Sequence, residues 1–241
     1  GARELAHAIG SLTGLRRLEL AVSGCSLGAS GVRKVARGLG SLTGLSRLKI
    51  DLGFNDTGDS GLRELSQALG SLVKLSSLEL NVNRNRISDM GLGWLAQAVS
   101  GLSRLQEFRL LVFDNRISEA GVHELSSAVR GLTAVSRLTL GLNRNSVNEA
   151  GVQDLVNAVS ALPGLTDLDL GLSISSLGWA GAHDLALSIG SLQMLTHLSL
   201  DLNVNQMGSA GARLLAQALS AQKGLTSLRL LASGNRIREV G

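Results

Sequence analysis

The chain has 241 residues, and its 23 lysines and arginines against 19 aspartates and glutamates give a formal net charge of +4. Hydrophobic residues make up 44%, which is enough for a folded core and excludes a disordered chain. Aromatic residues make up only 2% and Tyr is absent, which argues against a stacking platform for nucleic-acid bases. The small positive excess is spread along the chain, whereas nucleic-acid-binding proteins usually carry a clustered basic stripe. Composition therefore favours a folded protein and disfavours a nucleic-acid partner.

Glycine recurs at one fixed interval along the whole chain. It stands at Gly1, Gly31, Gly61, Gly91, Gly121, Gly151, Gly181, Gly211 and Gly241. A constant interval of this length is typical of a repeat protein, in which one short unit stacks on its neighbours. The interval predicts eight units of 30 residues, and positions 1 to 30 of each unit are counted here from its glycine.

The first part of each unit is predicted to be a helix. Positions 2, 5, 9 and 12 are apolar in nearly every unit, and spacings of three and four place them on one helix face. Glycines at position 10 are expected to end the helix in a left-handed conformation, and these are Gly10, Gly40, Gly70 and Gly190. Residues expected to cap the next helix are Ser88, Ser118 and Asn148, each followed by a carboxylate.

The second part of each unit is predicted to be a strand followed by a turn. Positions 15 to 22 change period, as in Leu75, Leu78, Leu80 and Val82, and from position 18 apolar and polar residues alternate. Position 25 is usually Asn, and we expect its side chain to face inward and bond the turn backbone as a ladder. The ladder residues are Asn55, Asn85, Asn115, Asn145, Asn205 and Asn235, with Cys25 and Ser175 as exceptions. Cys25 is expected to be a small buried hydrophobe.

The pattern Leu-x-x-Leu-x-Leu, then Asn-x-Ile, then a helix opening at Gly resembles a leucine-rich repeat. The stretch from Asn115 to Val129 is similar to repeats of the ribonuclease-inhibitor-like subfamily, which Ran GTPase-activating proteins, tropomodulin and NOD-like receptors also carry. Four residues separate Leu80 from Asn85 where the usual pattern has two, so we expect a longer strand.

The resemblance implies an α/β leucine-rich-repeat solenoid, a horseshoe with a parallel sheet on its concave face and helices on its convex face. Residues 1–241 are expected to form a single domain of eight repeats, and the chain to be a segment of a longer one. A solenoid with no capping repeats would also be able to stack end to end.

Two rows of side chains are expected on the exposed sheet face. One row alternates in sign through Glu19, Lys49, Glu79 and Arg109, which predicts ion pairs between neighbouring strands. The other row contains Asp167, His197 and Ser227, the residue set of a nucleophilic triad. An open sheet supplies neither an oxyanion hole nor exclusion of water, so a polar surface row is favoured over a hydrolase. We assign no catalytic residue, metal or cofactor.

Large apolar residues at places where the repeat expects polar ones are candidates for partner binding. The candidates are Arg109, Leu111 and Phe113 in the fourth unit, Arg229 and Leu231 in the eighth, and Trp94 on a helix. An exposed aromatic beside Arg is typical of a binding hot spot, although single exposed hydrophobes also occur without function. A basic rim is expected in the loops after the strands, formed by Arg84, Arg86, Arg116, Arg144, Arg236 and Arg238.

These features predict a non-catalytic interaction or structural module that binds a protein partner, or a larger assembly, on its concave sheet or loop edge. The alternative is a GTPase-regulating module similar to the Ran GTPase-activating proteins, whose catalytic positions have no residue-by-residue match here. Because Cys25 is the only cysteine, no intrachain disulfide is available, which favours an intracellular, cytoplasmic protein. No apolar run is long enough for membrane insertion.

Overall fold

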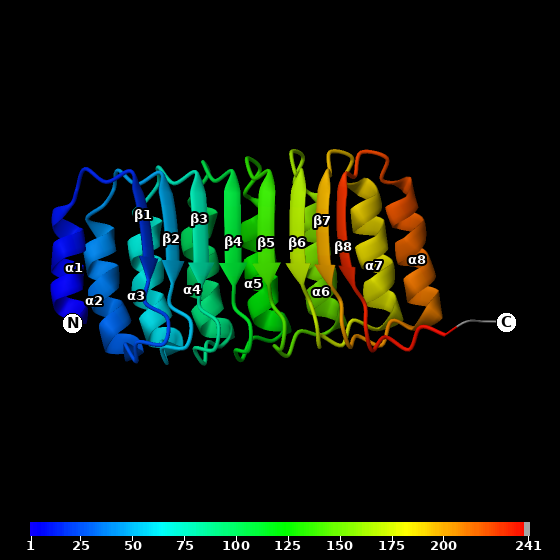
Figure 1. Cartoon of the computed structure of the whole chain (residues 1–241), viewed down its shortest axis with the longest axis horizontal. Helices are drawn as coiled ribbons and strands as arrows, with labels where there is room; N and C mark the ends of the chain where they lie inside the picture. Colours follow the sequence, from blue (N-terminus) through cyan, green and yellow to red (C-terminus); the bar gives the residue numbers. More distant parts are fainter. Residues whose placement is uncertain (239–241) are drawn as a thin grey trace.

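The computed structural model describes residues 1–238, in which a helix and a strand alternate eight times (Figure 1). The helices are α1 (Ala2–Ser11), α2 (Gly28–Gly40), α3 (Gly58–Gly70), α4 (Asp89–Ser100), α5 (Glu119–Arg130), α6 (Glu149–Ser160), α7 (Gly178–Ser191) and α8 (Gly208–Ala221). The strands are β1 (Arg17–Ala21), β2 (Arg47–Asp51), β3 (Ser77–Asn81), β4 (Glu107–Leu111), β5 (Arg137–Gly141), β6 (Asp167–Gly171), β7 (His197–Asp201) and β8 (Ser227–Leu231). Gly241, the last of the recurring glycines, lies outside the described residues.

The eight strands form one open parallel sheet in sequence order, and each pairs with the strand one unit further along the chain. The helices cover one face of this sheet, and their row extends beyond the row of strands at both ends (Figure 1). Neighbouring helices need about 8–10 Å and neighbouring strands about 4.8 Å, so the sheet takes the inner side of the curve. The α/β solenoid predicted from the sequence is confirmed.

The core runs without interruption between the sheet and the helices. Inward strand positions 18, 20 and 22 pack against helix positions 2, 5 and 9, and nearly all of these side chains are buried in the inner units. Phe108 replaces the usual Leu at position 18 and is 1% exposed. The other aromatic residues lie at or near the surface, as their departure from the repeat pattern predicts.

The strands are shorter than predicted, five residues at positions 17 to 21. The backbone nevertheless continues to pair beyond them. The amide of Leu52 donates to the carbonyl of Asn81 (2.8 Å), and that of Phe54 donates to Asn83 (2.9 Å). Equivalent bonds recur at positions 22 and 24 at all seven junctions between units. The residues that lengthen the unit thus extend the hydrogen bonding between units, although they are not part of the strands.

The prediction for glycine at position 10 is wrong. Gly40 and Gly70 end their helices without a left-handed backbone, and the residues after them are also right-handed. Left-handed glycines instead begin helices at position 28, where they are Gly28, Gly58, Gly178 and Gly208. Helices α2 to α8 therefore begin two or three residues before the recurring glycine.

The predicted caps occupy N-cap positions at the starts of α4, α5 and α6. Ser88 accepts a hydrogen bond from the amide of Met90 (3.3 Å), and Asn148 accepts one from the amide of Gly151 (3.0 Å). Ser118 makes no such bond; its hydroxyl donates to the carboxylate of Asp89 (2.6 Å) in the preceding unit, as the hydroxyl of Ser88 also does to Asp59 (2.6 Å). These residues therefore both begin helices and link units.

Close approach to the preceding helix explains the recurring glycine at five helix starts, which are Gly61, Gly91, Gly121, Gly151 and Gly211. A Cβ at Gly121 would lie 2.5 Å from Oδ1 and 3.0 Å from Cα of Asp89. At Gly61 it would lie 2.8 Å from Cγ2 of Thr57 and 3.1 Å from Cα of Ala29. Any larger residue would push neighbouring helices apart, so stacking selects glycine at this position.

Candidate protein-binding surface

The loops after the strands are held by the asparagine ladder at position 25. In a typical member, Oδ1 of Asn85 accepts from the amides of Asn55 (3.1 Å) and Thr57 (3.0 Å) in the preceding unit. Its Nδ2 donates to the carbonyl of Leu52 (2.9 Å). The other ladder asparagines, which repeat this pattern, are Asn55, Asn115, Asn145, Asn205 and Asn235. One side chain thus fixes two adjacent turns.

The ladder is interrupted at the junction between the fifth and sixth units, where position 25 is Ser175. Its side chain is buried, and its hydroxyl has no hydrogen-bond partner. Within residues 1–238 the amides of Asn145 and Val147 have no acceptor, unlike the corresponding amides at the other six junctions. Cys25 is exposed rather than buried, because the first unit has no neighbour on its outer side in this structure.

A second asparagine row, which the sequence reasoning missed, lies at position 23. Asn83, Asn143 and Asn203 each accept a hydrogen bond through Oδ1 from the amide at position 23 of the next unit, at 2.6–2.7 Å. The available signal was the Asn-x-Asn sequence in every second unit. Together the two rows brace the backbone on both sides of position 24.

Position 24 has a left-handed backbone in every unit. Its residues are Gly24, Phe54, Arg84, Asp114, Arg144, Ile174, Val204 and Gly234, with φ between 53° and 71°. This conformation favours glycine and is strained for β-branched residues. Phe54 (54%), Ile174 (47%) and Val204 (51%) nevertheless expose large apolar side chains there. We call positions 23 to 26 of all units the loop edge.

Arginine and phenylalanine side chains meet at the loop edge of the second to fifth units. Cζ of Arg84 lies 5.2 Å from the ring centroid of Phe54 and 5.6 Å from that of Phe113. Cζ of Arg144 lies 5.5 Å from the same Phe113 ring, from the other neighbouring unit. Arg84 also pairs with Asp114 (Nε to Oδ2, 2.7 Å). We call Phe54, Arg84, Phe113 and Arg144 the cation–π cluster.

The predicted basic rim is partly neutralised. Arg84 pairs with Asp114, and Arg86 pairs with Asp56 (3.2 Å). Within the described part of the chain, Arg116 and Arg144 have no acidic partner and are exposed. The loop edge carries five arginines (Arg84, Arg86, Arg116, Arg144 and Arg236) against two aspartates, Asp56 and Asp114, and Arg238 lies just beyond it. Its excess charge is therefore positive.

Arg109 belongs to the sheet face and lies apart from the cation–π cluster. Its guanidinium lies 3.6 Å from Glu79 and 3.5 Å from the hydroxyl of Thr139. Lys49 lies between Glu19 (3.0 Å) and Glu79 (3.9 Å), and its hydrogen bond to Glu19 raises the lysine pKa. These are the predicted pairs between strands, so the charges of this row are largely satisfied within the sheet.

Leu111 and Leu231 both stand at position 21, on the outward face of the sheet, and are half-buried. Leu111 leans over the neighbouring strand, since a Cβ at Gly141 would lie 2.9 Å from its Cδ2. Arg229 is exposed on β8, the last strand. The structure thus places Leu231 and Arg229 four strands away from Leu111 and Arg109.

In the row of Asp167, His197 and Ser227, only the first two side chains contact each other. Nδ1 of His197 lies 3.2 Å from Oδ1 of Asp167 and 2.9 Å from the hydroxyl of Thr196. Among the described residues no hydrogen bond joins His197 to Ser227. The hollow that these residues line is a shallow part of the open sheet face, so water reaches every member.

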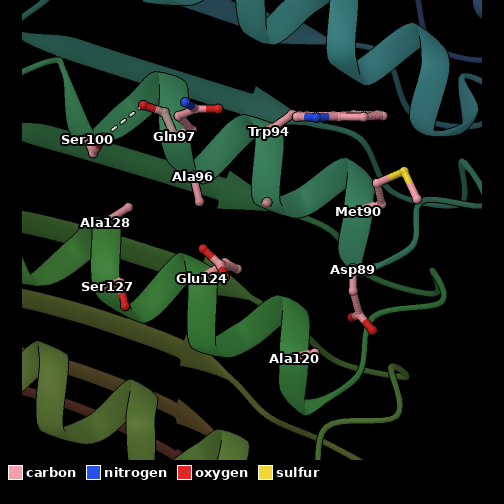
Figure 2. Close-up of a pocket in the computed structure, with 11 residues that line it drawn as sticks. Asp89, Met90, Trp94, Ala96, Gln97, Ser100, Ala120, Glu124, Ser127 and Ala128 are labelled. Atoms are coloured by element: carbon pink, nitrogen blue, oxygen red, sulfur yellow. Dashed lines mark hydrogen bonds between the residues drawn. The ribbon is translucent and has the colours of Figure 1, made fainter.

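Trp94 lies on the opposite, helix-covered side of the molecule. It is half-buried, and Cζ of Arg63 from α3 lies 5.1 Å from its ring centroid. A groove of about 710 Å³ separates α4 from α5, with Met90 and Glu124 on its two sides (Figure 2). In Figure 2 the indole ring extends away from the residues of α5. Trp94 and Phe113 therefore belong to different surfaces.

Among the described residues, no group of three or more His, Cys, Asp or Glu side chains is arranged to hold a metal ion. None of the helices in residues 1–238 combines the length and apolar character needed to cross a bilayer.

Comparison with known proteins gave one kind of match. Neither a protein-family model nor a curated protein sequence matches the chain. Among solved structures, internalin C2 from Listeria monocytogenes is similar, with 20% sequence identity and a TM-score of 0.46 over 94% of this chain and 92% of that one. The strand–helix units and the asparagine ladder of this chain are themselves the features of a leucine-rich-repeat solenoid.

Proposed function

We propose that this protein is a non-catalytic interaction module that binds a protein partner through its loop edge. The cation–π cluster is the observation that carries the proposal. Arg84 and Arg144 are held against Phe113, so the two guanidinium groups are oriented before a partner arrives. Arg and aromatic residues dominate the binding energy of many protein interfaces.

The loop edge is favoured over the sheet face because some of its arginines have no acidic partner among the described residues, whereas basic side chains of the sheet face are already paired. On the sheet face, Lys49 and Arg109 already contact carboxylates of neighbouring strands. At the loop edge, Arg116 and Arg144 are exposed and have no acidic partner among the described residues. Because the asparagine rows hold the loop backbone, little conformational entropy is lost when this surface binds.

The proposal is tested by capture of partners with matched single variants of the whole chain. Phe113→Ala and Arg144→Ala change the loop edge, Arg109→Ala changes the sheet face, and Arg130→Ala changes an exposed end of α5. We expect the two loop-edge variants to lose the proteins that the native chain captures, and the Arg130 variant to retain them. Retention of the same proteins by both loop-edge variants would contradict the proposal. Loss of these proteins only with Arg109→Ala would indicate that they bind the sheet face instead.

A GTPase-regulating role, as in the Ran GTPase-activating proteins, is the second candidate. Arg116 and Arg144 favour it, because an exposed arginine supplied in trans can stabilise the transition state of GTP hydrolysis, as in the activating protein of Ras. The test is GTP hydrolysis by a panel of purified small GTPases with and without the chain. Stimulation that Arg144→Ala abolishes would support this role, and absence of stimulation across the panel would remove it.

The broader setting is part of the same proposal. We infer that the units belong to the ribonuclease-inhibitor-like class, since each of the strands β1 to β7 is followed by a full α-helix. The chain would act as a scaffold inside the cell, where it holds a partner or takes part in a stacked assembly. A rigid, non-catalytic surface suits such a role. Sedimentation of the purified chain at increasing concentration tests the stacking.

A further inference from the structure

The chemical character of position 24 changes along the loop edge. From the second to the fifth unit the row carries Phe54, Arg84, Asp114 and Arg144. In the sixth and seventh units it becomes apolar, with Ile174 and Val204. The outermost members, Gly24 and Gly234, carry no side chain. The row thus has a charged half beside an apolar half.

The apolar half is not required by the fold. Ile174 and Val204 are β-branched residues in a left-handed conformation, and about half of each side chain is exposed. They lie on adjacent units, because the amide of Ile174 donates to the carbonyl of Asn203 (3.0 Å). Glycine occupies the same position in the two outer units without strain. Strained residues and exposed apolar groups that occur together point to a contact surface.

The backbone under this row is not available for strand addition. The amides at positions 22 and 24 already donate to the next unit at 2.8–3.1 Å at all seven junctions. A partner must therefore bind through side chains. An extended segment places side chains of one face about 6.6 Å apart, whereas successive members of the row are about 4.8 Å apart. On a helix, residues three and four apart are separated by about 4.5–6 Å along the axis, which matches the row.

We propose that position 24 forms a docking row for an α-helical segment of an acidic protein partner. This rests on the proposed function. Acidic residues at one end of the helix face Arg84 and Arg144, and apolar residues at the other end face Ile174 and Val204. The excess of arginine over aspartate on the loop edge favours an acidic segment. The four strand spacings from Arg84 to Val204 correspond to about 19 Å, or about 13 residues of helix.

The test uses a displayed library of 18-residue helix-forming peptides, randomised on one face, and selects binders of the whole chain. We expect the selected peptides to carry acidic residues at one end and Leu or Ile at the other, at spacings of three and four. Binding is then measured by fluorescence anisotropy. We expect Arg144→Glu to weaken it at least tenfold and the double variant Ile174→Gly, Val204→Gly to weaken it at least fivefold. Arg130→Glu on α5 is the matched control and should leave it unchanged.

Both glycine substitutions reproduce residues that the chain already has at this position, so loss of folding is not expected; circular dichroism of each variant checks this. Selected peptides with alternating, strand-like spacing, or peptides that bind the Arg144 and double variants as well as the native chain, would overturn the docking row. If natural partners depend on Phe113 and Arg144 while no helical peptide is selected, the docking row fails and the proposed function stands. If neither Phe113→Ala nor Arg144→Ala changes the capture of natural partners, the docking row and the proposed function both fail.

Discussion

The broken asparagine ladder leads to a direct prediction, that Ser175→Asn stabilises the protein. Elsewhere the ladder asparagine accepts from two amides of the preceding unit, as Asn145 does from Asn115 (3.2 Å) and Ile117 (3.2 Å). At the junction with the sixth unit the corresponding amides of the fifth unit, those of Asn145 and Val147, have no acceptor among the described residues. An asparagine at position 175 would supply one.

The expected gain follows from the bonds that the substitution adds. Each hydrogen bond to a backbone amide contributes about 0.5–1.5 kcal/mol net, and a buried hydroxyl without a partner is removed at the same time. Ordering the longer side chain opposes this by about 1 kcal/mol. The free energy of unfolding should therefore rise by about 1–3 kcal/mol. For a chain of this size, each kcal/mol corresponds to a shift in Tm of about 2–4 °C.

Urea unfolding followed by circular dichroism measures the gain, with two variants for comparison. Ser176→Asn adds the same residue at the exposed neighbouring position and should change stability by less than about 0.5 kcal/mol. Asn145→Ser adds a second interruption one junction earlier and should destabilise the chain. Hydrogen exchange gives the local readout, since the amides of Asn145 and Val147 should become more protected in Ser175→Asn. Unchanged exchange at these two amides, together with an unchanged midpoint, would refute the reasoning.

Three other predictions concern separate features. Gly121→Ala places Cβ 2.5 Å from a carboxylate oxygen of Asp89 and should lower the free energy of unfolding by about 1–3 kcal/mol in urea; an unchanged value would show that α4 and α5 separate easily. Ile174→Gly relieves about 1–2 kcal/mol of left-handed strain against about 0.5–1 kcal/mol of added chain entropy, so Tm should hold or rise, and a fall of several degrees would mean that the side chain supports the fold. The hydrogen bond that Nδ1 of His123 donates to Asp154 (2.7 Å), and then the charge of that carboxylate, raise the pKa of His123 above the usual 6.5. Since the folded pKa is the higher one, this stabilisation is complete below about pH 6.5 and is lost as pH rises through the folded pKa. The Tm difference between the native chain and His123→Ala should therefore be larger at about pH 6 than at about pH 9, and equal differences would contradict the pairing.

The fold was predictable because the repeat shows each position eight times. Alternation at positions 18 to 22 and the helical spacing of positions 2, 5 and 9 recur in unit after unit, so single exceptions such as Phe108 do not obscure them. What failed were inferences from one residue type. Glycine at position 10 was predicted to end the helix in a left-handed conformation, but none of these glycines has a positive φ. Cys25 was expected to be buried, but burial at position 25 comes from the preceding unit, which the first unit does not have.

Arg84, Phe113 and Arg144 of the proposed loop-edge site were named from the sequence, but their grouping was not predicted, and Ile174 and Val204 were not predicted at all. Phe113 was assigned with Arg109 because the two are close in sequence, whereas its ring faces Arg84 and Arg144 of the neighbouring units. Contacts of this kind join residues about 30 apart and depend on how far each side chain reaches across the stack. The left-handed backbone of position 24 also has no sequence signature here, since its residues range from Gly to Ile.

Adjacent positions of the same loop have different roles, because their side chains alternate between inward and outward. The inward one holds the backbone, and the outward ones form the exposed surface. The ladder residue at position 25 is buried and bonds both its own turn and the preceding one, so it tolerates little change. Positions 24 and 26 on either side of it project outward and take no part in these bonds, so their side chains vary freely from Gly to Phe, Arg and Ile. The inward asparagines hold the loop backbone, so the variable outward residues at positions 24 and 26 keep a constant spacing from unit to unit. A surface of this kind can change its partner through position 24 alone while the fold beneath it stays the same, which is why the strained Ile174 and Val204 are better explained by contact than by stability.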